Sequence, residues 1–137
     1  MPSIQVNLGE RSYPIAIQAG SLKDAGFLMQ AINSTQVVVI TNDVVAPLYL
    51  DTLLNTLKES QKNITSIILD DGEANKTLAS FEQVMEKLLQ QRVSRDACII
   101  ALGGGVVGDL SGFVAACYQR GIDFIQVPTT LLSQVDS

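Results

Sequence analysis

An apolar run that leads directly into a glycine-rich turn most constrains how this chain can fold. Residues 97–102 (ACIIAL) are apolar, and residues 103–109 (GGGVVGD) follow at once. This order predicts a buried strand, a tight turn and the start of a helix, an arrangement with which α/β proteins hold phosphate groups. Glycine lets backbone amides approach a ligand, and a helix start offers N–H groups that have no helical partner. The first hypothesis is therefore a nucleotide site.

This turn matches two standard phosphate-binding motifs only in part. Gly103, Gly105 and Gly108 match the GxGxxG pattern, but residues 128–130 (PTT) stand where an acidic ribose ligand is expected about 20 residues later. Residues 109–110 (DL) stand where a P-loop needs Lys and then Ser or Thr, which excludes a P-loop ATPase. A turn that only packs a helix closely on a sheet remains the structural alternative.

Composition indicates one globular domain that is chemically incomplete. The chain has 137 residues, of which 47% are hydrophobic and 17% charged, as expected for a domain with a real core. Its net charge of −5 and scattered basic residues argue against nucleic-acid binding, so an anionic ligand must be held by local groups. Histidine is absent, which removes the commonest general base and metal ligand.

The sequence predicts a cytoplasmic protein that makes no contact with membranes. Its N-terminus lacks the basic and apolar regions of a signal peptide, and Cys98 and Cys117 form no CxxC motif, so both are expected to be buried, reduced thiols. Residues 97–118 carry a single charge, but several glycines lie near the centre of this stretch. A buried strand, loop and helix is a better interpretation than a spanning helix.

The hydrophobic pattern predicts an α/β, Rossmann-like fold, with a mostly parallel sheet flanked by helices and an N-terminal β-hairpin. Alternation in residues 4–8 and 13–17 predicts the hairpin, and helical spacing predicts a short helix over 21–32. Strands and helices then alternate. The predicted strands are 37–40, 64–69, 97–102 and 124–127, and the predicted helices run through Leu50, Leu53 and Leu57, through 78–88, and from the glycine turn to Arg120.

Four polar loops should meet at one edge of this sheet, because ligands of such folds bind beyond the carboxyl ends of the strands. The loops are 41–43 (TND), 71–76 (DGEANK), 103–109 and 128–130. The second loop offers two acceptors and one cation, as a ribose and a pyrophosphate require, although such a loop is also typical of a solvated turn.

Three further groups have both a chemical and a structural interpretation. Asp109 is assigned to a ribose or substrate hydroxyl, or only to the helix dipole, while the amides of Gly105 to Gly108 are left to the phosphates. Arg120 lies about 15 Å along the helix from the glycine turn, so it must serve another ligand group or another subunit. Thr129 and Thr130 either provide hydroxyls to a ligand or only stabilise a turn.

Four motifs in order resemble the N-terminal half of the 3-dehydroquinate synthases. They are 71–77 (DGEANKT), 103–109 (GGGVVGD), 119–121 (QRG) and 127–137 (VPTTLLSQVDS), of which the last is the most specific. The resemblance covers essentially the whole chain. It implies an enzyme that converts 3-deoxy-D-arabino-heptulosonate 7-phosphate to 3-dehydroquinate and phosphate in the shikimate pathway, with bound NAD and a divalent metal, zinc or cobalt.

The resemblance also implies roles for individual residues. Arg120 is expected to reach the substrate phosphate of a neighbouring subunit in a homodimer, and Asp136 to lie near the nicotinamide. The implied NAD contacts are Asn42, Asp71, Gly72, Glu73, Ala74, Asn75, Lys76, Gly105, Val106, Val107, Gly108, Asp109, Thr129 and Thr130.

The resemblance further implies that essential parts of the enzyme are missing. The metal ligands of the family, a Glu and two His, belong to a C-terminal, largely helical domain. We therefore expect residues 1–137 to be an N-terminal NAD-binding domain that holds no metal ligands and is inactive alone. The alternatives are another sugar-phosphate cyclase that makes inosose or valiolone rings, a metal-dependent glycerol or alcohol dehydrogenase relative, and a non-enzymatic nucleotide-binding module.

Overall fold

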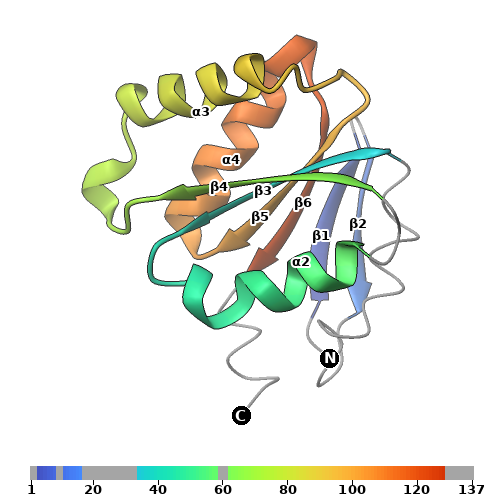
Figure 1. The fold of residues 1–137 in the computed structure, drawn as a ribbon, viewed down its shortest axis with the longest axis horizontal. Coiled ribbons are helices and arrows are strands. Elements are labelled where there is room, and N and C mark those ends of the chain that lie inside the picture. The colour runs from blue at the N-terminus through green and yellow to red at the C-terminus, as the bar shows by residue number, and fades with distance from the viewer. Residues whose placement is uncertain (1–2, 9–10, 17–33, 59–61, 129–137) are drawn as a thin grey trace.

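Six strands form one sheet in the order β2-β1-β6-β5-β3-β4 (Figure 1). The computed structural model describes residues 3–8, 11–16, 34–58 and 62–128, and in β1, β2, Arg120 and Pro128 only the backbone is described. Neighbouring strands from β6 to β4 are parallel, while β1 is antiparallel to β2 and β6. The strands are β1 Ser3–Leu8, β2 Arg11–Ala16, β3 Gln36–Asn42, β4 Asn63–Leu69, β5 Cys98–Gly103 and β6 Asp123–Pro128.

The predicted N-terminal hairpin is confirmed, with a shorter connection than expected. Strand β2 begins at Arg11, which pairs with Leu8, and Val6 pairs with Tyr13. The hairpin joins the parallel strands through β1, where Val6 lies opposite Ile125 of β6. The predicted helix 21–32 lies outside the described residues.

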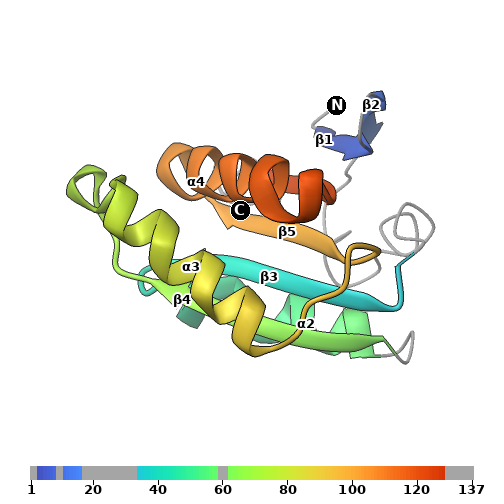
Figure 2. The ribbon, with the colours of Figure 1, turned by 90° about the horizontal axis from the view of Figure 1, so that it is seen from above.

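Helices cover both faces of the parallel strands (Figure 2). The π-helical turn η1 (Ala46–Leu50) and α2 (Asp51–Lys58) lie on one face, and α3 (Leu78–Gln90) and α4 (Gly105–Cys117) lie on the other. Within β3, Val37 and Val39 pack in the core on the α2 side, and Val38 and Ile40 pack in the core on the α3 and α4 side. The continuous β-branched run is therefore buried on both faces, as the sequence predicts.

The second predicted helix begins with a different geometry from the expected one. Its first turn is π-helical and includes Pro47, and the regular α-helix starts only at Asp51. The amides of Leu48 and Tyr49 both donate to the carbonyl of Val45, at 3.0 and 3.1 Å. A proline in the first turn has no N–H to lose, so it is compatible with this start.

The glycine helix ends earlier than the sequence predicts. Helix α4 stops at Cys117, and Arg120 lies in the following 3-10 turn, η3 (Tyr118–Arg120), in which Gln119 has a φ of 51°. At this end of the helix Tyr118 is buried, and its hydroxyl donates to the carbonyl of Val93 at 2.7 Å. The left-handed backbone of Gln119 then turns the chain out of the helical path.

The two cysteines differ in environment, which corrects the expectation that both are buried. Cys98 is buried in β5, and burial raises the pKa of its thiol to about 12. Cys117 is exposed at the end of α4. None of the described helices is both long enough and apolar enough to cross a membrane, and residues 97–118 form a strand, a turn and a helix as predicted.

The contact between the glycine turn and α4 predicts that Gly103 is required for stability. A Cβ at Gly103 would lie 3.0 Å from Cβ and Cγ2 of Val107, a buried side chain whose Cβ is fixed by the helix backbone, whereas a Cβ at Gly105 would meet nothing within 4 Å. We expect Gly103→Ala to lower the free energy of unfolding by about 1–3 kcal/mol. The matched Gly105→Ala change should alter it by less than about 0.5 kcal/mol. Urea unfolding measures both, and equal effects would contradict this assignment.

Candidate nucleotide-binding site

A cleft of 280 Å³ opens at the carboxyl ends of β3, β4 and β5. Their arrowheads point toward the same side of the sheet in Figure 1. Three of the four predicted polar loops meet there, and Pro128, which opens the fourth, pairs with Gly103 on the neighbouring strand. Thr129, Thr130 and Asp136 lie outside the described residues. The cleft is lined by Asn42, Val44, Val45, Asp71, Gly72, Glu73, Gly104, Gly105, Val106 and Val107.

The glycine turn presents the start of α4 to this cleft. Gly104 precedes the helix as its N-cap and has no side chain to cap it, and a Cβ on Gly104 or Gly105 would meet nothing within 4 Å. The first helical hydrogen bond is donated by Gly108 to the carbonyl of Gly104, at 3.0 Å. The amides of residues 105–107 therefore precede the helical ladder, and together with the helix dipole they suit an anion such as a phosphate.

Packing explains the other glycines of the motif. A Cβ on Gly103 would lie 3.0 Å from two atoms of Val107, and Gly108 is in close contact with Gln126. The amide of Gly108 is already used within the helix. Gly103 and Gly108 thus fit the packing interpretation of the motif, and Gly104 and Gly105 fit the ligand-binding interpretation. Gly104, which the sequence analysis did not include among the site residues, lines the cleft, and the consecutive glycines at 103–105 were the available signal.

Asn42 connects the ends of β3 and β4. Its side chain is 7% exposed, and its Oδ1 accepts from the amides of Val44 at 3.1 Å and Val45 at 2.8 Å. Its Nδ2 donates to Oδ1 of Asp71 at 3.0 Å. Asp43 accepts from the amide of Asp71, also at 3.0 Å. Asp43 lies in a predicted polar loop, but its role there could not be predicted, because a contact across 28 residues leaves no local signal.

The predicted loop 71–76 is a short ordered turn. Gly72 has a φ of 118°, which favours glycine, and Glu73–Asn75 form the 3-10 turn η2. Asn75 donates through Nδ2 to the carbonyl of Asp71 at 2.8 Å, and Ala74 is exposed. Asp71, Gly72 and Glu73 line the cleft, but Ala74 and Asn75 do not.

Lys76 and Asp109, predicted separately to bind a cofactor, form an ion pair with each other. Their Nζ and Oδ2 atoms are 2.8 Å apart, and the side chains are 43% and 63% exposed. The hydrogen bond to Asp109 and its negative charge raise the pKa of Lys76. The pair lies beside the cleft, in an apolar groove of 270 Å³ that also contains Phe81 and Phe113, whose ring centroids are 4.8 Å apart.

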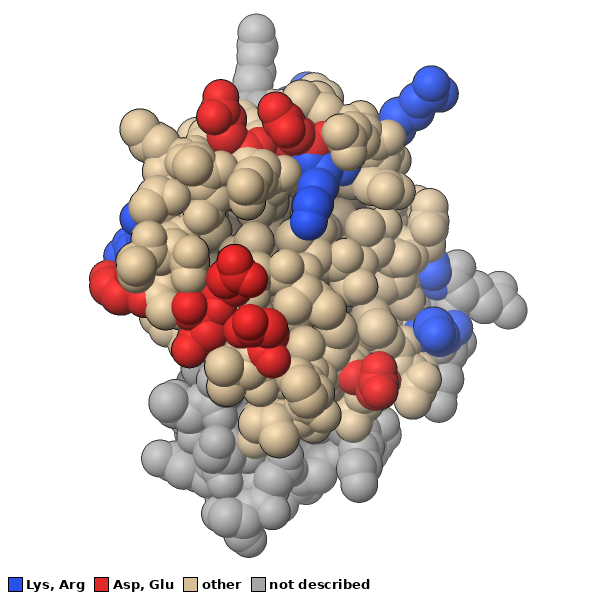
Figure 3. Space-filling model, turned by 60° about the vertical axis from the view of Figure 1, so that its left-hand side comes forward, with Lys and Arg blue, Asp and Glu red and all other residues tan. Residues whose placement is uncertain are grey.

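Acidic side chains outnumber basic ones around the carboxyl ends of the strands. Figure 3 shows the side that lies at the left of Figure 1, and red side chains lie in several groups on it, the largest at the lower left. The acidic residues that follow β3, β4 and β5 are Asp43, Asp70, Asp71, Glu73 in η2 and Asp109 in the first turns of α4, with Lys76 among them. An anionic ligand here must therefore be held by local amides and by Lys76, since the surrounding charge does not attract it.

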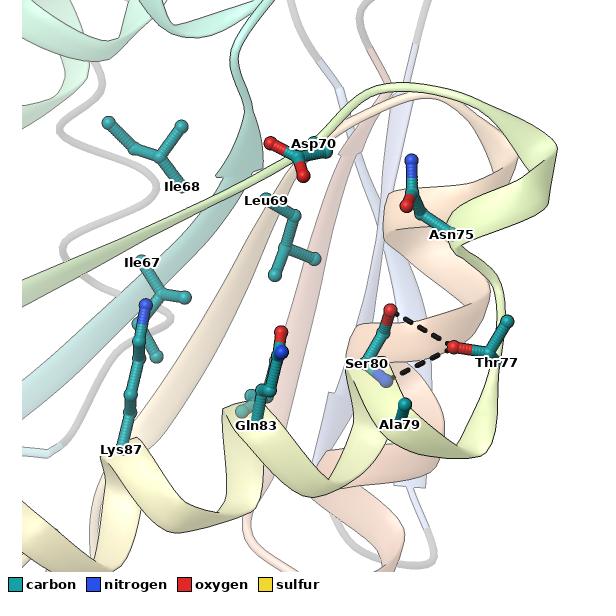
Figure 4. Close-up of a pocket in the computed structure, with 11 residues that line it drawn as sticks. Ile67, Ile68, Leu69, Asp70, Asn75, Thr77, Ala79, Ser80, Gln83 and Lys87 are labelled. Atoms are coloured by element: carbon teal, nitrogen blue, oxygen red, sulfur yellow. Dashed lines mark hydrogen bonds between the residues drawn. The ribbon is translucent and has the colours of Figure 1, made fainter.

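A second cavity, of 300 Å³, lies between β4 and α3 (Figure 4). Of the predicted site residues that the structure describes, only Asn75 lines it. At its end, Thr77 caps α3 by accepting from the amide of Ser80 at 3.1 Å. This cap starts the helix directly after Lys76 and so fixes where Lys76 leaves the loop.

The described residues contain no group of three or more His, Cys, Asp and Glu side chains that could hold a metal ion. The whole sequence also contains no histidine. The residues present here therefore do not fit a divalent metal, and the cleft fits an anionic organic ligand better.

The fold and the cleft are those of an α/β protein with a candidate ligand site at the carboxyl edge of its parallel strands. Residues 66–137 match the profile of the family described as "3-dehydroquinate synthase N-terminal". The chain belongs to the 3-dehydroquinate synthase family. It is 56% identical to the 3-dehydroquinate synthase of Nitrosococcus oceani over all 137 of its residues, which span 38% of that relative's length.

Two solved structures are similar in fold. A 2-deoxy-scyllo-inosose synthase complexed with carbaglucose-6-phosphate, NAD⁺ and Co²⁺ has a TM-score of 0.80 and is 23% identical, covering 93% of this chain and 35% of that one. The 2-epi-5-epi-valiolone synthase of Streptomyces hygroscopicus with NAD⁺ and Zn²⁺ has a TM-score of 0.73 and is 24% identical, covering 90% and 34%. At this level of identity the likeness shows the Rossmann-like fold.

The ion pair predicts a measurable shift in the titration of Lys76. We expect Asp109→Asn to lower the pKa of Lys76 toward its ordinary value, because both the hydrogen bond to a carboxylate and its charge are lost. Glu73 contributes less, so Glu73→Gln should lower this pKa by a smaller amount. NMR titration of the lysine Nζ measures both. A pKa of Lys76 that is the same in Asp109→Asn would contradict the pairing.

Proposed function

We propose that this chain is the NAD-binding part of a 3-dehydroquinate synthase. The open start of α4, where Gly104 and Gly105 leave room beside free amides, is the observation that carries the proposal. The reaction proposed for the whole protein is the conversion of 3-deoxy-D-arabino-heptulosonate 7-phosphate to 3-dehydroquinate and phosphate, a lyase reaction of the shikimate pathway. The relatives that carry this name support it, although the chain spans 38% of their length.

Different residues in and beside the cleft would bind different parts of NAD. The amides of residues 105–107 would hold the pyrophosphate of NAD, and Lys76 lies beside the cleft, where it is paired with Asp109. Asp71, whose Oδ2 has no partner among the described residues, would accept from ribose hydroxyls. Pairing with Lys76 offsets the negative charge of Asp109, which would otherwise repel the phosphates.

NAD would supply reversible hydride acceptance to the reaction when bound. The chain's own contribution is to bind and orient the dinucleotide at the sheet edge, where Thr129 and Thr130 remain predicted contacts. A divalent metal, zinc or cobalt, is proposed to be held by residues outside this chain, because the described residues offer no ligand cluster and the sequence no histidine.

The proposed protein is a cytoplasmic homodimer. Arg120 lies at the far end of α4 from the glycine turn, which favours a role at the substrate phosphate of a neighbouring subunit. Asp136 remains a predicted contact near the nicotinamide. Another sugar-phosphate cyclase is the second candidate, since an inosose synthase shares the fold with a TM-score of 0.80.

Binding of NAD tests the proposed site directly. We expect Gly105→Val to weaken NAD binding at least about tenfold, because a branched side chain would fill the space beside the phosphate-binding amides. Gly105→Ala should have a smaller effect in the same direction. Neither side chain meets another group within 4 Å of its Cβ, so thermal unfolding should show both variants folded. Isothermal titration calorimetry measures the affinity, and a normal affinity in Gly105→Val would refute the assignment.

The 137-residue chain alone should form no 3-dehydroquinate even with NAD and zinc or cobalt added. The physical reason is the missing histidine and the missing ligand cluster among the described residues. Product analysis by chromatography checks this, and measurable 3-dehydroquinate would contradict it. The same product analysis on a full-length protein containing this chain separates dehydroquinate from inosose or valiolone.

A further inference from the structure

We propose that Asn42 and Asp43 are positioning residues, which hold the carboxylate of Asp71 ready to receive the adenosine ribose hydroxyls of NAD. The inference rests on the proposed NAD site and goes beyond it. The family resemblance implies that Asn42 itself contacts the cofactor. The structure also joins Asn42 to Asp71, a residue 29 positions further along the chain.

The hydrogen-bonding capacity of Asn42 is nearly used up inside the protein. Its amide oxygen accepts from two backbone amides, Val44 and Val45, and its amide nitrogen donates to Asp71. One N–H of the side chain remains without a partner among the described residues. Although Asn42 lines the cleft, it is buried and most of its capacity serves the protein, so its bond to Asp71 is one route by which it can act on a ligand.

Asp71 is held from three directions although it is exposed. Its Oδ1 accepts from Asn42, its amide donates to Oδ1 of Asp43, and its carbonyl accepts from Asn75. These contacts fix both the backbone and the side chain, and they leave Oδ2 without a partner among the described residues. A carboxylate on a solvent-exposed loop would normally lose rotamer freedom on binding, and here that loss has already occurred on folding.

Asp71 and the glycine turn are placed to bind two neighbouring parts of NAD, the adenosine ribose and the pyrophosphate. Asp71 follows β4, two strands away from the glycine turn after β5, and both line one cleft. Amides at the turn would take the pyrophosphate, and the fixed carboxylate would accept from the adenosine ribose. Accurate placement of Oδ2 of Asp71 determines how much the ribose 2′-hydroxyl contributes to the affinity for NAD.

The test uses Asn42→Asp, which keeps the oxygen that caps Val44 and Val45 and replaces the donor to Asp71 by an acceptor. Binding of NAD and of its 2′-deoxyadenosine analogue is measured by calorimetry on the full chain. We expect Asn42→Asp to weaken NAD binding about tenfold, the loss of one hydrogen bond to a charged group. The ratio of the affinity for NAD to the affinity for the deoxy analogue should fall toward one. General loosening of the fold would lower both affinities and leave this ratio unchanged.

A double-mutant cycle separates positioning from charge. In the Asp71→Ala background, Asn42→Asp should have little further effect on NAD affinity, because the residue that it positions is gone. If Asn42→Asp lowers NAD affinity by the same factor with and without Asp71, the added charge simply repels the phosphates. That result would overturn the inference.

Asp43 supplies a second and independent variant pair. Asp43→Asn keeps the oxygen that accepts from the amide of Asp71 and should retain both affinity and preference for NAD, whereas Asp43→Ala should lose part of both. This pair decides the question if Asn42→Asp unfolds, which its thermal midpoint reports.

The outcomes distinguish the two proposals. If the unmodified chain does not bind NAD, both the proposed function and this inference fail. If it binds NAD but shows no preference over the deoxy analogue, or if Asn42→Asp and Asp43→Ala behave like the unmodified chain, the inference alone fails.

Discussion

Burial of the central parallel strands on both faces is the constraint on which the rest of the structure depends. Strands β3 and β5 are buried along nearly their whole length, so each face needs its own cover, and the chain provides α2 on one side and α3 with α4 on the other. Crossing through these helices makes the strands parallel and brings their carboxyl ends to one edge. The meeting of loops 41–43, 71–76 and 103–109 is therefore a consequence of how the core is covered.

The glycine motif serves packing and ligand access at the same time, but not with the same residues. Gly103 and Gly108 lie where a side chain would collide with Val107 or Gln126, so they allow α4 to lie close to the sheet. Gly104 and Gly105 have open space beside them and leave the helix start accessible. The close packing of α4 holds those amides in place, so the stability of the helix and the shape of the cleft are linked.

An acidic chain can hold an anionic cofactor only if its carboxylates are kept in defined places. Asp109 pairs with Lys76, which offsets its charge, and Asp71 is fixed by Asn42 and Asp43 in an orientation that suits hydroxyl groups. In the proposed NAD site, acceptors for the sugar and amides for the phosphates would thus lie side by side. The placement of both carboxylates depends on contacts between segments that are distant in sequence.

Among the described residues, the sequence by itself determined the layers, the alternation of strands and helices, the N-terminal hairpin and three of the loops that meet at the site, because apolar periodicity and glycine position are local properties. It did not determine that α4 ends at Cys117, where Tyr118 is buried and bonds to Val93, a residue in another segment. Nor did it determine that Lys76 pairs with Asp109 or that Asn42 serves Asp71. These contacts join residues 29 to 33 positions apart, and only the packing of the sheet and helices brings such residues within hydrogen-bonding distance.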